Sequence, residues 1–351
     1  MKVARGRIAA IRARAPKGAR GVSLRGGYVA PGFIDLHVWG DPRTVSRGSV
    51  QGGTTAFLTA LGPEPPEQLA EDVEVRADIV GLDGAACLGL HLEGPFLNPA
   101  RAGALQKRWM RRPTVEELRR LVRAAGGRVK LITIAPELPG AVEAIRWCAK
   151  RGIVASLGHS DADARAAGQA VAAGARAVTH VFNGMRPLHH RSSSLVDIAL
   201  TDLRLATMVI ADGIHVSPTA LRLLFRAKGP QGVALVTDSV RYQRHDWHLR
   251  ARGGAYYLSA PRRQAGQAGT SRGTLAGSAL TMIGAVRNAV QLGGSSLADA
   301  VQMASSVPAR LLGDRRRGAL SIGARADLVV FDRQFRVRLT IVGGRVVYKR
   351  S

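Results

Sequence analysis

Four side chains that suit hydrolytic metal chemistry stand singly at the ends of apolar, β-like runs. Glu93 ends GLHLE, His159 follows VASLG, His180 follows AVT and Asp238 follows ALVT. A turn-forming Gly, Ser or Asn comes within three residues of each. Each is therefore expected at the carboxyl end of a buried parallel strand. In a β/α barrel those ends form one rim, where active sites are built.

Glu93, His159 and His180 are residue types that bind a divalent cation. A carboxylate at a buried strand end needs a metal or a cationic partner to offset its desolvation, so a structural ion pair is the alternative for Glu93. The two histidines lie 21 residues apart on successive strand ends, which favours one metal ion. We expect zinc, although iron, manganese and cobalt accept the same ligands; the ion would lower the pKa of a bound water toward ~7.

Asp238 is placed to move protons. It follows the apolar run VALVT and precedes Ser239. From a strand end it would take a proton from the attacking water and pass it to a leaving amine. The alternative is a helix N-cap at a strand-to-helix turn, a common use of Asp.

The elements that must position these residues repeat as strand and helix along the chain. Apolar runs alternate with helix-like stretches through roughly eight units, which predicts a β/α barrel. The helix TVEELRRLVRAAG shows its own signals: Thr114 as N-cap with Glu117 three residues later, and Gly126 and Gly127 as its end.

The two ends of the chain and one internal segment read differently from the repeats. Residues 1–30 and 318–351 are short β-like pieces with Gly-rich turns, which predicts one small discontinuous β domain beside a barrel of residues 31–317. Residues 241–274 resemble a hairpin and loop near Asp238 and are a candidate lid.

Composition limits the classes of partner. The formal charge is 51 − 25 = +26, which favours anionic ligands, but the arginines are spread along the chain and aromatic residues make up only 5%. Specific nucleic-acid binding is therefore disfavoured. Neither an apolar run of about 18 residues nor a secretory signal stands out, so we expect no membrane span and a cytoplasmic location.

The motifs also carry a family resemblance over nearly the whole chain. Their order resembles that of the N-acetylglucosamine-6-phosphate deacetylases of the amidohydrolase superfamily: PGFIDLHVWG, HLEGPFLNP, IAPE, GHSDA, THVFNGMRPLHHR, IADGIHVSP, LVTDS, GTLAGSALTM and GARADLVVFD. This resemblance implies a TIM-like (β/α)8 metal-dependent hydrolase barrel with a small β-sandwich domain from both termini, usually as a homodimer. It also implies one divalent metal ion on Glu93, His159 and His180, with Asp238 as catalytic acid and base.

The same resemblance implies a set of substrate contacts. They are Asn183, Gly184, Arg191, His215, Ala104, Leu275, Ala276 and Gly277. Arg191 would hold the phosphate, since an arginine fork fits a phosphate; in so arginine-rich a chain, a solvated surface arginine is the alternative. His215 would polarise the substrate carbonyl, with a structural histidine as its alternative.

Several positions depart from the family pattern. The superfamily often has His-x-His after PGFID, whereas this chain has His37-Val38-Trp39, so His37 is at most a weak or vestigial ligand. Leu105 stands where these enzymes usually have a substrate-contacting His, and Ser239-Val240 replaces a small residue and Met. In the lid, Arg262, Arg263, Tyr256 and Tyr257 have no clear counterpart.

The function expected is therefore a metal-dependent deacetylase. It would hydrolyse the acetamide of an N-acetylated amino-sugar phosphate, N-acetylglucosamine 6-phosphate in the first place, to the free amine and acetate. Two alternatives stay open from the residues. One is a deacylase of a different N-acyl substrate, suggested by Leu105 and the lid. The other is a non-catalytic binder of anionic polymer on a decayed barrel, suggested by the charge of +26 and by the departures from the family pattern.

Overall fold

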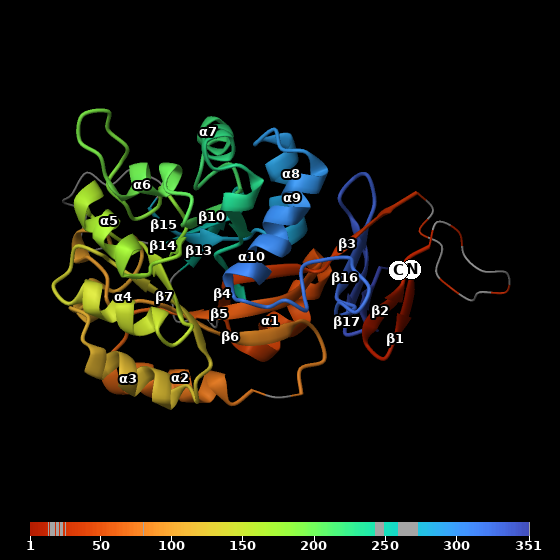
Figure 1. Ribbon diagram of the computed structural model, residues 1–351, viewed down its shortest axis with the longest axis horizontal. Helices are drawn as coiled ribbons and strands as arrows, with labels where there is room; N and C mark the ends of the chain where they lie inside the picture. The colour runs from red at the N-terminus through yellow and green to blue at the C-terminus, as the bar shows by residue number, and fades with distance from the viewer. Residues whose placement is uncertain are drawn as a thin grey trace.

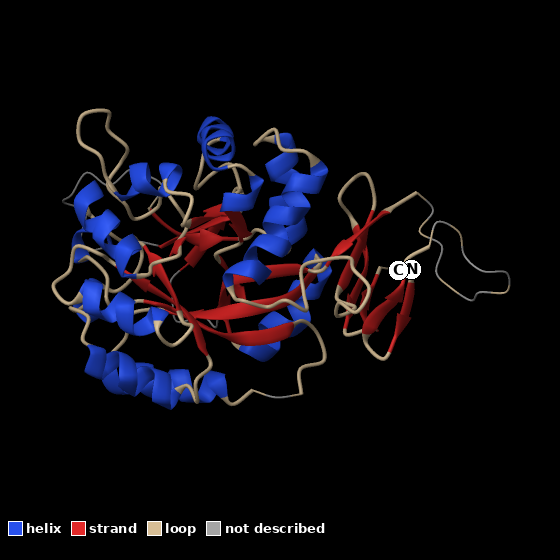
Figure 2. Cartoon of the chain, viewed as in Figure 1, coloured by secondary structure: helices blue, strands red, loops and turns tan. Residues whose placement is uncertain are grey.

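Parallel strands form the centre of the molecule and helices surround them (Figures 1 and 2). This computed structural model describes residues 1–12, 14, 18, 21, 24, 26–79, 81–242, 249–258 and 273–350. The central strands are β4 (Phe33–Gly40), β5 (Thr54–Leu61), β6 (Ala86–Glu93), β7 (Val129–Ile134), β8 (Val154–Leu157), β9 (Ala177–Val178), β10 (Ala206–Ile210) and β11 (Val233–Val236).

These strands pair in chain order, each parallel to the next from β4 to β11. The sheet curls until β11 returns to β4. There the Asp238 amide donates to the His37 carbonyl at 2.9 Å, and the Thr237 hydroxyl donates to the buried Asp35 carboxylate at 2.5 Å. The expected (β/α)8 barrel is thereby confirmed.

Helices follow most of the strands and cover the outside of the barrel. They are α1 (Pro42–Ser49), α2 (Pro66–Ala77), α3 (Val115–Ala124), α4 (Ala141–Ala149), α5 (Ala164–Ala173), α6 (Leu195–Thr201), α7 (Pro218–Lys228), α8 (Met282–Gln291), α9 (Leu297–Ala304) and α10 (Ser306–Leu311). The signals expected for α3 are confirmed: the Thr114 hydroxyl accepts from the Glu117 amide at 3.2 Å, and Gly126 and Gly127 adopt positive φ after the helix. No helix in the described ranges is long and apolar enough to cross a membrane.

Two apolar layers hold the barrel together. Side chains such as Leu36, Leu131, Met208 and Val236 fill its lumen and are fully buried. A second, larger cluster lies between strands and helices. The residues at the strand ends lie above this filled lumen, so the site that they form is supported from below by packed side chains.

Short strands extend the sheet beyond the barrel and a separate sheet joins the chain ends. The extension comprises β12 (Ser239–Tyr242), β13 (Leu249–Arg252), β14 (Ala255–Leu258) and β15 (Thr274–Ser278). In the lid segment, Tyr256 and Tyr257 lie on β14, whereas Arg262 and Arg263 lie outside the described residues. The terminal strands are β1 (Lys2–Ala4), β2 (Arg7–Ala10), β3 (Tyr28–Pro31), β16 (Leu328–Phe331), β17 (Val337–Val342) and β18 (Arg345–Lys349).

The chain ends meet through direct strand pairing. β3 runs antiparallel to β16 in a sheet ordered β18-β17-β16-β3, and β1 pairs with β2. Figure 1 shows these strands together at one end of the molecule, with both termini beside them. The small β unit beside the barrel is thus built from both ends of the chain.

Candidate active site

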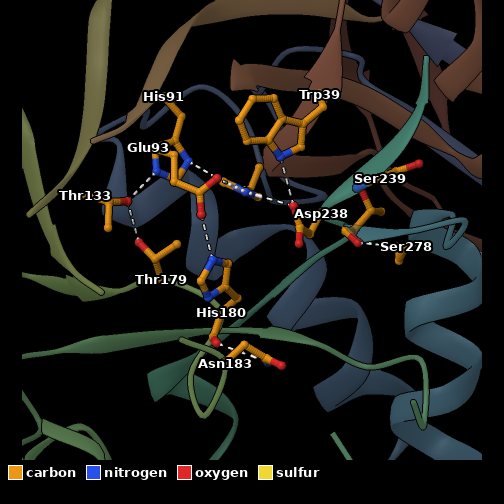
Figure 3. Close-up of polar contacts among 12 residues, drawn as sticks. Trp39, His91, Glu93, Thr133, Thr179, His180, Asn183, Asp238, Ser239 and Ser278 are labelled. Carbon is orange, nitrogen blue, oxygen red and sulfur yellow. Dashed lines mark hydrogen bonds and ion pairs between the residues drawn. The ribbon is translucent and has the colours of Figure 1, made fainter. Parts of the chain in front are cut away.

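The carboxyl ends of the strands bring Glu93, His159 and His180 into contact. Glu93 Oε1 lies 3.0 Å from His159 Nε2 and 2.7 Å from His180 Nε2. All three side chains are buried. Figure 3 shows His180 pointing at Glu93, with Asp238 on the side of the cluster toward Trp39.

The backbone is unusual at the strand ends that carry this chemistry. His159, His180 and Asp238 have φ of 48°, 28° and 47°, in the left-handed region that residues with a Cβ rarely adopt. Such conformations concentrate where a side chain must be aimed in a particular direction. The three side chains that follow from these turns line one cavity.

The protonation pattern of His159 fits a metal ion. Its Nδ1 lies 2.8 Å from the Arg101 carbonyl oxygen, which only accepts, so Nδ1 carries the proton. In the neutral ring, Nε2 then presents a lone pair toward Glu93 Oε1. Two lone pairs that face each other need a cation between or beside them, and a metal-binding histidine typically donates its other N–H to a carbonyl in this way.

Glu93 is held as a carboxylate by imidazoles alone. Burial opposes its ionisation, but the charge of His37 and the close contacts of His159 and His180 hold its pKa well below the usual range. Among the described residues its ion-pair partners are histidines, His37, His159 and His180, and no lysine or arginine pairs with it. A divalent cation would meet an ionised oxygen and two imidazole nitrogens.

His37 lies under the cluster, fully buried. Its Nε2 is 3.0 Å from Asp238 Oδ1 and 3.4 Å from Glu93 Oε2, without the alignment of a hydrogen bond to either. Burial disfavours its charge, yet Glu93 and Asp238 together raise its pKa to about 10. Ligand atoms of His37, Glu93 and His180 all lie within 4.8 Å of one another, so the trio that has this spacing contains His37 in place of His159.

A buried polar chain that sequence reasoning missed supports His37. His91 Nδ1 lies 2.7 Å from His37 Nδ1. Its other ring nitrogen, Nε2, lies 2.8 Å from the Thr133 hydroxyl (Figure 3). Hydroxyl contacts continue from Thr133 to Thr179 at 2.8 Å and on to Ser156 at 2.6 Å. The available signal was the period of two in HLE, which turns His91 to the same face as Glu93.

Asp238 faces the cluster and is fixed from the side by Trp39. The Trp39 indole N–H donates to Asp238 Oδ1 at 3.0 Å (Figure 3). The residues after Asp238 form strand β12, not a helix, so the N-cap alternative is wrong. Trp39 therefore occupies the place of the missing second imidazole and contacts the carboxylate that was expected to move protons.

His215 is oriented by a carboxylate three residues before it. His215 Nδ1 lies 2.6 Å from Asp212 Oδ2, while Asp212 Oδ1 accepts from the Ile214 and His215 amides at 2.8 Å each. Burial opposes protonation of His215, but the hydrogen bond and charge of Asp212 raise its pKa above the usual 6.5. The other ring nitrogen is left for the cavity.

One cavity unites most of the residues expected from sequence. Its lining comprises Trp39, Glu93, Gly103, Ala104, Leu105, His159, His180, Asn183, Gly184, His215, Asp238, Thr274, Leu275, Ala276 and Gly277. Arg191 is not brought there: it is exposed on a loop, where its Nη1 lies 2.8 Å from His190 Nε2. Trp39 and Leu105 belong to one apolar cluster, so two departures from the family pattern form a single wall.

Comparison with known proteins agrees with this geometry. Residues 28–347 match the Amidohydrolase family. The N-acetylglucosamine-6-phosphate deacetylase of Bacillus subtilis (strain 168) is 36% identical over 336 residues, covering 91% of this chain and 84% of that protein. The human protein of the same name is 36% identical over 358 residues, covering 92% and 84%.

Solved structures give the same result. A mutant N-acetyl-D-glucosamine-6-phosphate deacetylase from Mycobacterium smegmatis, in complex with N-acetyl-D-glucosamine-6-phosphate, superposes with a TM-score of 0.87 at 31% identity, over 99% of this chain and 94% of that one. The Thermotoga maritima deacetylase gives 0.84 at 28% identity over the same shares. With a carboxylate, two imidazoles and an aspartate on the rim of its barrel, this chain belongs to the amidohydrolase family, and within it to the N-acetylglucosamine-6-phosphate deacetylases.

Proposed function

We propose that this chain is a metal-dependent deacetylase that hydrolyses N-acetylglucosamine 6-phosphate to glucosamine 6-phosphate and acetate. The observation that carries the proposal is the convergence of Glu93, His159 and His180 with Asp238 in one cavity. The names of the relatives, and the sugar phosphate bound to one of the similar structures, support the substrate.

Each residue has a defined part in this reaction. Glu93, His159 and His180 would hold a divalent metal ion, and such an ion would supply Lewis-acid chemistry, making the substrate carbonyl more electrophilic and water more acidic. Asp238 accepts a proton from the attacking water on a carboxylate oxygen and delivers it to the departing nitrogen. The Trp39 indole fixes the direction of that carboxylate.

Substrate orientation falls to the remaining lining residues. His215, held by Asp212, donates toward the carbonyl oxygen as negative charge develops there. The sugar is contacted by Ala104, Asn183, Gly184 and residues 275–277. This assignment is supported by the position of these residues in the lining of the cavity. A phosphate contact by Arg191 remains a prediction from the family motif.

The metal and the assembly belong to the same proposal. Zinc suits two imidazoles and one carboxylate, and elemental analysis of the purified protein would distinguish it from iron, manganese or cobalt. We also propose a homodimer in the cytoplasm, on the family resemblance. Sedimentation at several protein concentrations tests the dimer.

One observation favours a second candidate, deacylation of a different N-acyl compound. Trp39 and Leu105 pack together in the cavity wall, and neither offers a hydrogen-bond acceptor to a substrate hydroxyl. A site with an apolar wall rejects a polar group that it cannot pair.

Amine release by the metal-quantified protein tests both candidates. N-acetylglucosamine 6-phosphate is the substrate and N-acetylglucosamine the matched unphosphorylated control. Turnover of the phosphorylated sugar alone supports the proposed reaction. Full metal loading with turnover of neither sugar rejects it in favour of another N-acyl substrate.

A further inference from the structure

Glu137 ties together two loops that the proposed chemistry depends on. It follows β7 in the motif IAPE, and its Oε1 accepts from the Asn98 side-chain amide at 2.8 Å and from the Asp161 backbone amide at 2.6 Å. Its Oε2 accepts from the Ser160 hydroxyl at 2.8 Å. Asn98 lies in the β6 loop (94–101) and Ser160 and Asp161 lie in the β8 loop (158–163), so one carboxylate joins both loops.

These loops hold His159 from both sides. Its carbonyl accepts from the Asn98 backbone amide at 2.9 Å, and its Nδ1 donates to the Arg101 carbonyl at 2.8 Å. Both contacts come from the β6 loop, although His159 itself belongs to the β8 loop. The separation of the two loops therefore sets where the lone pair of His159 points.

Further contacts make the same junction specific. The Arg101 guanidinium donates to the Asp161 carboxylate through Nε at 2.8 Å. This contact fixes Arg101, whose own carbonyl accepts the hydrogen bond of His159. Arg186, after β9, pairs with the other oxygen of Asp161 at 2.9 Å. Glu137 accepts from the backbone of this same Asp161. The carboxylate thus sits at the point where the loops after β6, β8 and β9 meet.

We propose that Glu137 is a positioning residue: it locks the β6 and β8 loops together so that His159 Nε2 and Glu93 Oε1 converge on one metal ion. The inference rests on the metal site of the proposed function. Glu137 does not line the catalytic cavity and acts through its hydrogen bonds with Asn98, Ser160 and Asp161. Residues that orient metal ligands in this way typically change metal affinity by 10–100-fold when removed.

Cobalt(II) binding to Glu137→Ala and Glu137→Gln tests the proposal. The measurements are the Co(II) dissociation constant, the visible absorption of the bound ion, which reports ligand geometry, and the free energy of unfolding. Glu137→Ala is expected to weaken Co(II) binding by about 10–100-fold and to alter the spectrum. Glu137→Gln should recover most of both, because its amide oxygen can still accept from Asn98 and Asp161.

Glu143→Ala is the matched control. Glu143 lines the same surface groove as Glu137, but it is exposed on α4, and no hydrogen bond or ion pair joins it to either loop among the described residues. It should bind Co(II) as the wild type does. Should Glu137→Ala fail to fold, Ser160→Ala, which removes only one of the three hydrogen bonds, should show a smaller shift in the same direction.

A purely structural role gives a different result. If Glu137→Ala lowers the free energy of unfolding while the Co(II) spectrum and affinity stay at wild-type values, the proposal is overturned. Wild-type affinity in Ser160→Ala, where that variant has to be used, overturns it as well. Failure of the proposed function is seen separately, as metal-loaded wild-type protein that releases no amine from the sugar phosphate.

Discussion

Asp238 is the residue at which proton transfer and metal binding can be separated. Asp238→Asn keeps the shape and an acceptor for the Trp39 indole, but it cannot take a proton from water. Amine release should fall about 10²–10⁴-fold while metal content stays near that of the wild type. The neighbouring Ser239→Ala is the control and should keep most activity. Equal activity in Asp238→Asn would remove Asp238 from the mechanism.

His215 gives the molecule a pH-dependent contribution to stability. Burial opposes its charge, but Asp212 raises its pKa above 6.5, so this pair stabilises the fold fully below the unfolded pKa and less as pH rises through the folded pKa. In Asp212→Asn the turn is kept, because Asn Oδ1 still accepts from Ile214 and His215.

Urea unfolding at pH 5.5 and pH 9 measures this effect. The difference in unfolding free energy between the wild type and Asp212→Asn should be larger at pH 5.5. Taking the difference at each pH removes the contributions of the other titrating groups, because the two proteins share them. An equal difference at both pH values would mean that the charge of Asp212 does not stabilise protonated His215.

At the scale of elements, the strand pattern predicts which residues lie at the strand ends, but not the hydrogen bonds that join one strand end to another. Apolar runs that end in one metal-type residue have few ways to fold other than as buried parallel strands, so Glu93, His159 and His180 converged as expected. Trp39 and Asp238 are 199 residues apart, and nothing local in either segment signals their hydrogen bond. Arg191 was expected in the site from its place in a motif, but it is exposed on a loop outside the cavity, because a motif position does not determine the direction of an exposed loop side chain.

In the loop after β9, His159 lies where a side chain on one glycine would have to be. Gly184 has φ of 62°, and a Cβ added there would lie 2.8 Å from His159 Nδ1 and 3.1 Å from the Arg101 carbonyl oxygen. Gly184→Ala should therefore push the ring away from the carbonyl that orients it, and we expect metal affinity to fall about 10–100-fold, measured by equilibrium dialysis.

Gly168→Ala is the control for this glycine. Gly168 lies within α5, where nothing is within 4 Å of an added Cβ and φ is ordinary. The change should leave metal affinity unaltered and stabilise the helix by roughly 0.5–1 kcal/mol. Unchanged metal affinity in Gly184→Ala would show that the β9 loop yields easily and does not fix His159.

At the scale of the whole molecule, the terminal sheet and the barrel share one apolar core. Val329, Phe331 and Val337 belong to the same buried cluster as Phe33 at the start of β4. The Thr340 hydroxyl also donates to the Val50 carbonyl at 2.7 Å, across the junction. Although sequence divides the chain into residues 31–317 and a terminal β unit, this packing favours a single cooperative unfolding unit.

Phe331→Ala tests that cooperativity. Phe331 is fully buried in the terminal sheet, so its loss should cost about 3–5 kcal/mol. Trp39, Trp109 and Trp147 lie in the described part of the barrel chain and no tryptophan lies in the terminal strands, so fluorescence in urea does not report the terminal sheet directly. We expect the barrel transition to shift by the full cost, because the barrel cannot stay folded while the shared core is exposed.

Val346→Ala, on the exposed face of the same sheet, is the control and should change stability by less than about 0.5 kcal/mol. A barrel transition that stays in place in Phe331→Ala would show that the terminal sheet unfolds as a separate domain.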